Sequence, residues 1–397
     1  MAKHTTGCPG KERYLSGKRI LPEPVSKQTD IGTLVDNMDA YNGGRLRAAC
    51  QLLKEKYSQE DVTIGMSLAG ALTPAGLGPS AIIPLMNHGY VDWLVATGAN
   101  MYHDIHFVFN LPMFRGSHQV DDVDLRAKGV TRIYDILFDY QNVLMETDRR
   151  LNEILIRPEF QKEMGTREFY HHLGKILSEI EEKNKTGQVS ILAAAYRLGI
   201  PVFTSSPGDS TIGMNIAGLE LLAEAAGLSE KFKLKINPSI DVNESTAIIL
   251  NAKIYEKGKT AVILVGGGSP KNFMLQTEPQ IQEILRINEV GQDYFIQITD
   301  ARVDTGGLSG ATPKEAVTWG KIDPNEVEKS VIVYTDSTIA LPLITSYVMQ
   351  NTRAKKLKRL YDRKDELMKK LKESYFENFR KTSPKEMDML EELLDSD

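Results

Sequence analysis

The chain has 397 residues, is 41% hydrophobic and 25% charged, and carries a formal net charge of −5 at pH 7. This composition is typical of a soluble globular protein, and its slight acidity argues against a nucleic-acid partner, since such proteins usually present a basic face. Two cysteines, Cys8 and Cys50, exclude a disulfide framework, and the lack of a signal-peptide core or a membrane-length apolar run predicts a cytoplasmic protein without a membrane partner.

Residues 1–56 predict an amino-terminal segment of arm and helices. The first 30 residues are polar with scattered glycine and proline, which is typical of an extended arm. From Ile31 to Lys56, apolar residues recur at helical spacing. Asn42-Gly43-Gly44 predicts a break between two helices in this stretch.

Residues 57–350 alternate short apolar runs with helical stretches and predict one large catalytic domain. Six runs of strand length are continuously apolar or β-branched: 62–68, 91–97, 200–204, 261–265, 294–299 and 331–334. Fully apolar strands separated by helices imply a parallel sheet that helices cover on both faces. The predicted fold class is therefore α/β, with a Rossmann-like parallel sheet.

Small and acidic residues follow the predicted strands, at the edge where ligands bind in open parallel sheets. They are Thr97-Gly98, residues 205–210, Gly266-Gly267-Gly268, Thr299-Asp300 and residues 335–337. The chain has no GxGxxG fingerprint, so a standard dinucleotide site is not indicated. The triple glycine is either a tight turn or a place where the backbone approaches a pyrophosphate.

His103-Asp104-Ile105-His106 resembles half of a metal site, because zinc takes histidine and carboxylate ligands. No third or fourth ligand follows at a useful spacing, so we expect no metal. We expect His103 to face a cofactor or substrate instead. Histidine titrates near a pKa of about 6.5 and suits acid/base work.

The stretch from 307 to 322 reads GLSGATPKEAVTWGKI. Thr312 to Glu315 has the pattern of a helix start, with a hydroxyl cap, a proline and a glutamate three residues after the cap. Gly320 predicts the end of this short helix, which leaves Lys321 on the following turn beside an indole. A neutral lysine forms imines with carbonyl-like carbons, and an aromatic face holds a cationic amine. The alternative is a solvated lysine after an ordinary helix.

Residues 351–397 predict a helical extension. Apolar residues recur at helical spacing in this otherwise charged segment; they are Leu357, Leu360, Tyr361, Leu367, Met368, Leu371, Tyr375 and Phe379. The pattern predicts one long amphipathic helix that breaks near Ser383-Pro384. Its apolar stripe is equally suited to a subunit contact and to docking on its own domain.

Five blocks of the chain resemble deoxyhypusine synthases, in the same order along the sequence. They are VDWLVATGA (91–99), GIPVFTSSPGDSTIG (199–213), AVILVGGGSPKNF (261–273), DYFIQITDARVDTGGLSGATPKEAVTWGKI (293–322) and VIVYTDSTIALPLI (331–344). The resemblance covers about residues 61–349. It implies an enzyme of polyamine metabolism that binds NAD and assembles as a homotetramer, with sites completed across a dimer interface.

The chemistry that this resemblance implies is an aminoalkyl transfer with no net redox change. A hydride passes from the carbon beside a polyamine's secondary amine to NAD, and Lys321 captures the resulting imine with loss of a diamine. The group then moves to an acceptor amine, and the hydride reduces the new imine. Such a lysine must be neutral at working pH, and the site must exclude water.

Individual residues match positions of the family. Glu315 and Trp319 match donor-binding positions, although Glu315 also fits as the partner of the Thr312 cap. The residues that match cofactor contacts are Thr97, Gly98, Asp209, Gly266, Gly267, Thr299, Asp304 and Asp336. Asp209 and Asp336 fit equally well as helix caps.

The chain also departs from the family. The positions where the family has further acidic residues and a histidine for the polyamine are occupied by His103, Met214, Asn272 and Leu308, and Gly70 and Ala71 replace polar cofactor contacts. We count His103 and Asn272 among the substrate-binding candidates. Fewer carboxylates suit a donor that is shorter or less charged than spermidine, because unpaired buried charge is expensive.

Three functions are compatible with these residues. The first is an NAD-dependent aminoalkyl transferase for small amines, similar to the homospermidine-forming branch of the family. The second is a deoxyhypusine synthase whose acceptor is a lysine of a translation factor. The third is a catalytically inactive NAD-binding scaffold, against which the retention of Lys321, Trp319 and Glu315 argues.

Overall fold

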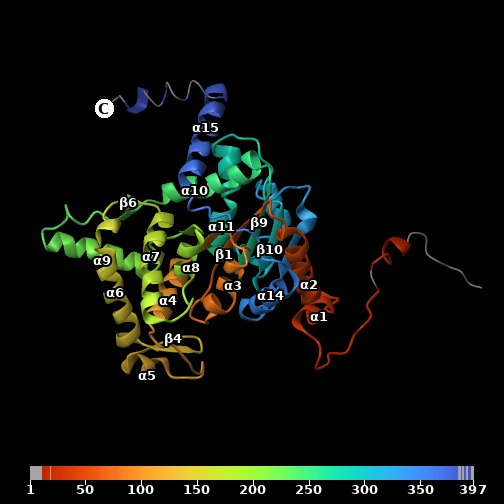
Figure 1. Cartoon of the computed structure of the whole chain (residues 1–397), viewed down its shortest axis with the longest axis horizontal. Helices are drawn as coiled ribbons and strands as arrows, with labels where there is room; N and C mark the ends of the chain where they lie inside the picture. Colours follow the sequence, from red (N-terminus) through yellow and green to blue (C-terminus); the bar gives the residue numbers. More distant parts are fainter. Residues whose placement is uncertain (1–10, 18, 383–385, 387–388, 390–391, 395–397) are drawn as a thin grey trace, which may run out of the picture.

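The structure is a computed structural model that describes residues 11–17, 19–382, 386, 389 and 392–394 (Figure 1). Cys8 and the helix break predicted at Ser383-Pro384 lie outside these residues. Within the described part of the chain, no helix is both long and apolar enough to span a bilayer.

Six parallel strands form the central sheet. They are β1 (Val62–Leu68), β2 (Trp93–Ala96), β7 (Val202–Thr204), β9 (Lys259–Val265), β10 (Tyr294–Ile298) and β11 (Ser330–Val333). Their spatial order is β11-β10-β9-β1-β2-β7, and every neighbouring pair is parallel. All six predicted strands and their parallel pairing are confirmed.

Alternate residues of these strands point into two separate hydrophobic clusters, one on each face of the sheet. Met66 and Ile263 belong to the first cluster, and Val95 and Leu264 belong to the second. The strands are apolar throughout because both faces are buried.

Helices from different parts of the chain supply the two layers. The first cluster includes residues of α1 (Ile31–Asp36), α2 (Tyr41–Leu52), α3 (Ile83–Asn87), α4 (Gly98–Val108), α6 (Glu146–Leu155), α7 (Thr166–Asn184), α8 (Ile191–Leu198) and α14 (Ser337–Asn351). The second includes residues of α10 (Pro238–Leu250), α11 (Gly268–Leu275), α13 (Pro313–Thr318) and α15 (Lys364–Thr382). The predicted cover on both faces is therefore confirmed.

Further elements lie around the sheet, and some of them also contribute buried residues to the two clusters. They are α5 (Asp122–Ala127), α9 (Thr211–Ala225), α12 (Thr277–Pro279), the helical turn η7 (Gln280–Ile284), the small sheet β3 (Phe114–Arg115), β5 (Ile136–Asp139) and β4 (Val130–Ile133), and the pair β6 (Glu163–Met164) and β8 (Lys235–Ile236). In Figure 1, α5 and β4 lie at the bottom of the molecule, far from α10 and α11.

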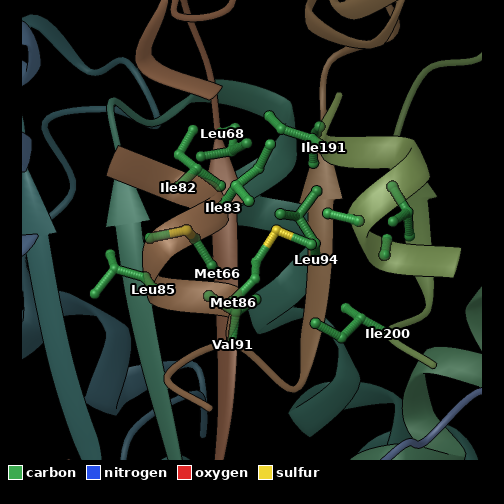
Figure 2. Packing of buried hydrophobic residues seen from close by; sticks show 14 of the residues in the cluster. Met66, Leu68, Ile82, Ile83, Leu85, Met86, Val91, Leu94, Ile191 and Ile200 are labelled. Atoms are coloured by element: carbon green, nitrogen blue, oxygen red, sulfur yellow. The ribbon is translucent and has the colours of Figure 1, made fainter. Parts of the chain in front are cut away.

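Side chains from the sheet and its covering helices interdigitate on the first face. Figure 2 shows Met86 of α3 directed toward Leu94 of β2, with Met66 of β1 in the same layer. Each of the three is fully buried. Two flexible methionines adapt their shape to the space beside the branched leucine, which suits a layer built from a short helix on a twisted sheet.

The predicted helix break at Asn42-Gly43-Gly44 is wrong. These residues form the first turn of α2, and the break lies just before it. A Cβ at Gly44 would lie 3.0 Å from the carbonyl oxygen of Asp39, so the glycine admits the incoming chain at close range. The first N–H groups of a helix have no acceptor inside the helix, so glycine in the first turn does not end the helix.

The carboxyl-terminal prediction is right only in its second half. The helix α15 begins at Lys364, whereas the residues before it run as an irregular strap, 353–363, along the amino ends of the strands. Lys355 is buried there and donates from Nζ to the carbonyl oxygens of Tyr57 and Val62 at 2.8 and 3.1 Å. Tertiary hydrogen bonds of this kind replace those that a helix would make.

The apolar stripe of α15 docks on its own domain. Leu367 and Leu371 are buried in the second cluster, and Lys370 donates to the side chain of Asn251 at 2.9 Å. Of the two alternatives for this stripe, the structure supports docking on the same chain.

Gly65 provides a test of the packing on the second face. A Cβ at this position of β1 would lie 2.7 Å from the indole of Trp93, which is fully buried. Gly65→Ala should lower the free energy of unfolding by about 1–3 kcal/mol, because overpacking forces neighbours from their rotamers. Chemical denaturation measures the change.

The control is Gly218→Ala in α9, where a Cβ would meet nothing within 4 Å. This variant should be neutral or more stable by up to about 1 kcal/mol, since alanine favours a helix. Equal stability of the two variants would contradict the packing described for Gly65.

Candidate active site

The short helix α13 positions the candidate lysine. The hydroxyl of Thr312 accepts the backbone N–H of Glu315 at 3.2 Å, and Gly320 ends the helix with a φ of +67°. The predicted cap and stop are therefore confirmed. The backbone of Lys321 is held on both sides, because its N–H donates to Ala316 O and its carbonyl accepts Gln292 N–H, each at 3.0 Å.

Lys321 faces a pocket of about 340 Å³, which we call the lysine pocket. The pocket brings together four predicted residues, Asn272, Glu315, Trp319 and Lys321, with Leu308 on the same wall. Trp319 is 60% exposed, so its indole forms an open rim rather than a buried wall.

The ammonium group of Lys321 has a neutral partner. Nζ donates to Oδ1 of Asn272 at 3.0 Å and lies 5.7 Å from the centre of the Trp319 ring. Partial burial lowers the pKa of Lys321, and the carboxylates of Glu315 and Glu283 oppose this shift. A lysine with a lowered pKa is a better nucleophile at neutral pH, since more of it is uncharged.

Two carboxylates of the pocket are free to receive a cation. Neither the Glu283 nor the Glu315 side chain forms an ion pair or hydrogen bond with any described residue. The reciprocal bond from the Glu315 side chain to the Thr312 cap is likewise absent from this part of the structure, so Glu315 remains available to a ligand.

Sequence reasoning missed Lys271 and Glu283. Lys271 is 4% exposed, lines the same pocket, and donates to Ala311 O at 2.7 Å and Gln297 Oε1 at 3.0 Å. Burial lowers its pKa to about 8. The sequence could have indicated Lys271, because it lies just after the triple glycine that follows a predicted strand. It could not have indicated Glu283, which lies in an ordinary helical stretch.

The predicted cofactor residues lie where the central strands end. Thr97 caps α4 after β2, with its hydroxyl accepting Asn100 N–H at 3.3 Å, and Gly98 follows as the first helical residue. Thr299 follows β10, and Asp336 caps α14 after β11 through Thr338 N–H at 2.6 Å. The cap alternative for Asp336 is therefore confirmed.

The triple glycine makes a tight turn between β9 and α11. Gly266 and Gly268 have positive φ values of +77° and +59°. A Cβ at Gly267 would lie 2.4 Å from Cα of Ser309, whose hydroxyl accepts Gly268 N–H at 3.0 Å. Close packing on residue 309 thus explains Gly267, whereas a Cβ at Gly268 would face open space.

Two acidic candidates are exposed on loops. Asp209 precedes α9, but the cap of that helix is Ser210, which accepts Gly213 N–H at 3.3 Å; the cap alternative for Asp209 is wrong. Asp304 pairs with the neighbouring Arg302 at 2.5 Å in an exposed ion pair. As cofactor contacts, both stay predictions.

His103 lies in a different environment from Lys321. Its Nδ1 is 3.0 Å from Nε2 of His106, whose Nδ1 is 2.8 Å from the Thr147 hydroxyl. Burial lowers the pKa of His103 to about 4, so it is neutral at physiological pH. It does not line the lysine pocket, and its role in binding substrate stays a prediction.

Met214 does not line the lysine pocket either, and it lies on an exposed face of α9. Of the two apolar replacements expected near the donor, only Leu308 lines that pocket. Among the described residues, no group of three or more histidine, cysteine, aspartate or glutamate side chains is arranged to hold a metal ion.

Known proteins that are similar to this chain indicate its family. A family model described as deoxyhypusine synthase matches residues 33–348. A "Deoxyhypusine synthase-like protein" of Nostoc punctiforme is 51% identical over 90% of each chain, and one of Thermosynechococcus vestitus is 49% identical over 95% of this chain and 93% of its own. A "Probable deoxyhypusine synthase 2" of Archaeoglobus fulgidus is 38% identical over 77% of this chain and 92% of its own.

A solved structure shares the fold. It belongs to an Entamoeba histolytica protein assigned as a deoxyhypusine synthase, with a TM-score of 0.51 and 14% identity, and the match covers 84% of this chain and 98% of that chain. At this identity the likeness concerns the fold alone.

The electrostatics of the pocket can be tested through the pKa of Lys321. Glu315→Gln and Glu283→Gln each remove a carboxylate that stabilises the ammonium form, so both should lower the pKa of Lys321 further. The effect of Glu315 should be the larger. NMR of ¹³C-methylated lysines measures the titration, with Lys321→Arg identifying the signal.

The matched control is Glu328→Gln, which removes an exposed carboxylate outside the lysine pocket and should leave the titration unchanged. An unchanged or raised pKa in both pocket variants would show that these carboxylates do not act on Lys321.

Proposed function

This chain belongs to the deoxyhypusine synthase family of transferases, and from that premise we propose that it is an NAD-dependent aminoalkyl transferase that works through an imine on Lys321 and acts on small amines. The observation that carries the proposal is a partly buried lysine with a neutral acceptor, Asn272, in a pocket that also holds two carboxylates unpaired among the described residues. A nucleophile and cation-binding groups in one pocket suit an amine substrate.

Lys321 is the nucleophile of the proposed reaction. Its neutral Nζ attacks the oxidised donor carbon, a bond from that carbon to Nζ forms, and the bond to the departing diamine breaks. The departing nitrogen takes the proton that Nζ gives up. Asn272 holds Nζ by its carbonyl oxygen at 3.0 Å and aims it into the pocket.

One of the two carboxylates orients the donor. Glu315 pairs with a terminal ammonium, and the open face of Trp319 covers the methylene chain or a cation. Leu308 gives the pocket an apolar surface. A carboxylate at this position would instead favour a donor with one more positive charge. This balance supports an amine with fewer charges than spermidine, as in the homospermidine-forming branch.

The carboxyl edge of the sheet supports an NAD site. Numbered along the chain, the six strands have the order 3-2-1-4-5-6, which in open α/β sheets creates a binding crevice where the order reverses. Here β1 and β9 flank that point, and Gly70 and Gly268 leave open space above their backbone. Helix starts at Gly98 and Ser337 add N–H groups suited to a pyrophosphate.

NAD, when bound, would accept a hydride from the donor and return it to the product. The chain's own residues bind the amine and hold Nζ. The homotetramer implied by the family stays a prediction; the exposed Leu221 and Leu222 of α9 are compatible with a subunit contact.

Lys321→Arg should abolish transfer while NAD binding remains close to that of the unmodified chain. Arginine keeps the charge but does not become neutral at usable pH. Mass spectrometry of products from a polyamine panel measures transfer, and borohydride should trap the aminoalkyl group on Lys321 of the unmodified chain. Transfer at full rate by the arginine variant would exclude the covalent step.

Substrate choice is tested at Leu308. The unmodified chain should use putrescine or homospermidine at least as well as spermidine. Leu308→Asp should lower KM for spermidine by about tenfold or more, because a charge-assisted hydrogen bond contributes about 1.5–3 kcal/mol. Val123→Asp on α5, also an exposed apolar position, is the control and should change nothing.

The translation-factor alternative gives a different result. If the unmodified chain makes deoxyhypusine on a translation factor faster than it turns over any small amine, the small-amine assignment is wrong. If no amine and no factor is a substrate although NAD binds, the chain is an inactive scaffold.

A further inference from the structure

A helical ridge separates the lysine pocket from a second pocket. The helices α11 and α12 and the turn η7 follow one another along the chain, and Asn272, Gln276, Pro279 and Glu283 recur at spacings of four, three and four residues. Residues at these spacings share one helix face. All four line both the lysine pocket and a second pocket of about 380 Å³.

The flanks of the ridge belong to one pocket each. Lys271 and Leu275 line only the lysine pocket, whereas Phe273, Gln280 and Ile284 line only the second pocket. The two pockets therefore adjoin along the ridge, one on each flank. A group on the crest is reached from both sides, and Asn272 on that crest contacts Lys321.

The second pocket has the chemistry of an amine site. Glu283 presents a carboxylate that is unpaired among the described residues, and Gln280 adds an amide. Ser205, which follows β7, has a buried hydroxyl oxygen without a hydrogen-bond partner in the described structure. A buried, unpaired hydroxyl is costly unless a ligand satisfies it.

We propose that the second pocket binds the acceptor of the transfer, a free aliphatic diamine whose far ammonium pairs with Glu283. This inference rests on the proposed function. The near amine, uncharged, attacks the imine carbon held by Lys321, a carbon–nitrogen bond to the acceptor forms, and the bond to Nζ breaks. The proton that the acceptor amine loses passes to Nζ, which leaves Lys321 as a free amine.

A diamine fits this arrangement better than a protein lysine. The side chain of a lysine has one amine, which the attack consumes, so Glu283 would stay unpaired. A diamine has a second amine that remains protonated and pairs with the carboxylate. Entry from the far side of the ridge also lets the acceptor bind while the aminoalkyl group occupies the lysine pocket.

The test is Ile284→Lys, which places an ammonium in the second pocket at a side chain that is 61% exposed and tolerant of charge. In the holoenzyme with saturating donor, KM for putrescine as acceptor should rise about tenfold to a hundredfold. Donor KM and the borohydride-trapped adduct on Lys321, measured without acceptor, should stay within about twofold of the unmodified chain. Val123→Lys should alter none of these.

Calorimetric binding of putrescine gives a readout that does not need turnover. Glu315→Gln weakens binding in the lysine pocket, and the affinity that remains should fall about tenfold when Ile284→Lys, which lines only the second pocket, is added. If this loss occurs but no adduct forms on Lys321, the proposed function fails and the diamine site stands. If the adduct forms and Ile284→Lys changes neither acceptor KM nor this affinity, or changes donor KM equally, the second pocket is not the acceptor site.

Discussion

Parallel pairing of six apolar strands is the constraint on which the rest of the structure depends. Both faces of such a sheet must be covered, so the chain returns through a helix after each strand. Every strand therefore ends at the same edge, and the turns that carry Thr97, Gly266, Thr299 and Asp336 meet there. The lysine pocket lies on the second face, where residues of α11, α13 and β10 line it together.

Two lysines of the lysine pocket are buried or partly buried beside neutral hydrogen-bond acceptors, and this lowers their pKa values. Lys271 and Lys321 both donate to neutral oxygens, from an amide side chain or the backbone. A direct ion pair would stabilise the ammonium form and suppress nucleophilicity. The carboxylates of Glu283 and Glu315 act from further away, which keeps them available to a cationic ligand while they moderate the loss of charge on Lys321.

The sequence carried enough information to predict the strands and the Lys321 turn, because both depend on local rules: continuous apolar runs, a hydroxyl cap and a stopping glycine. It failed where tertiary contacts override local pattern, as at Gly44, which admits the chain at Asp39, and in the strap, where Lys355 binds backbone carbonyls. Glu283 was missed because periodicity does not reveal which face of a helical segment borders a cavity.

The strap also affects how the chain is synthesised. The backbone N–H groups of Lys355 and Tyr361 donate to the carbonyl oxygens of His88 and Gly199. These two acceptors lie just before β2 and β7, which are synthesised much earlier than the strap. When these strands leave the ribosome, the strap that covers their amino ends has not yet been made. The strand β1 also lacks its neighbour β9, which is made later. The sheet is closed only when nearly the whole polypeptide has emerged, so a nascent chain exposes its most apolar segments for most of its synthesis and is then a natural client for chaperones that shield such surfaces.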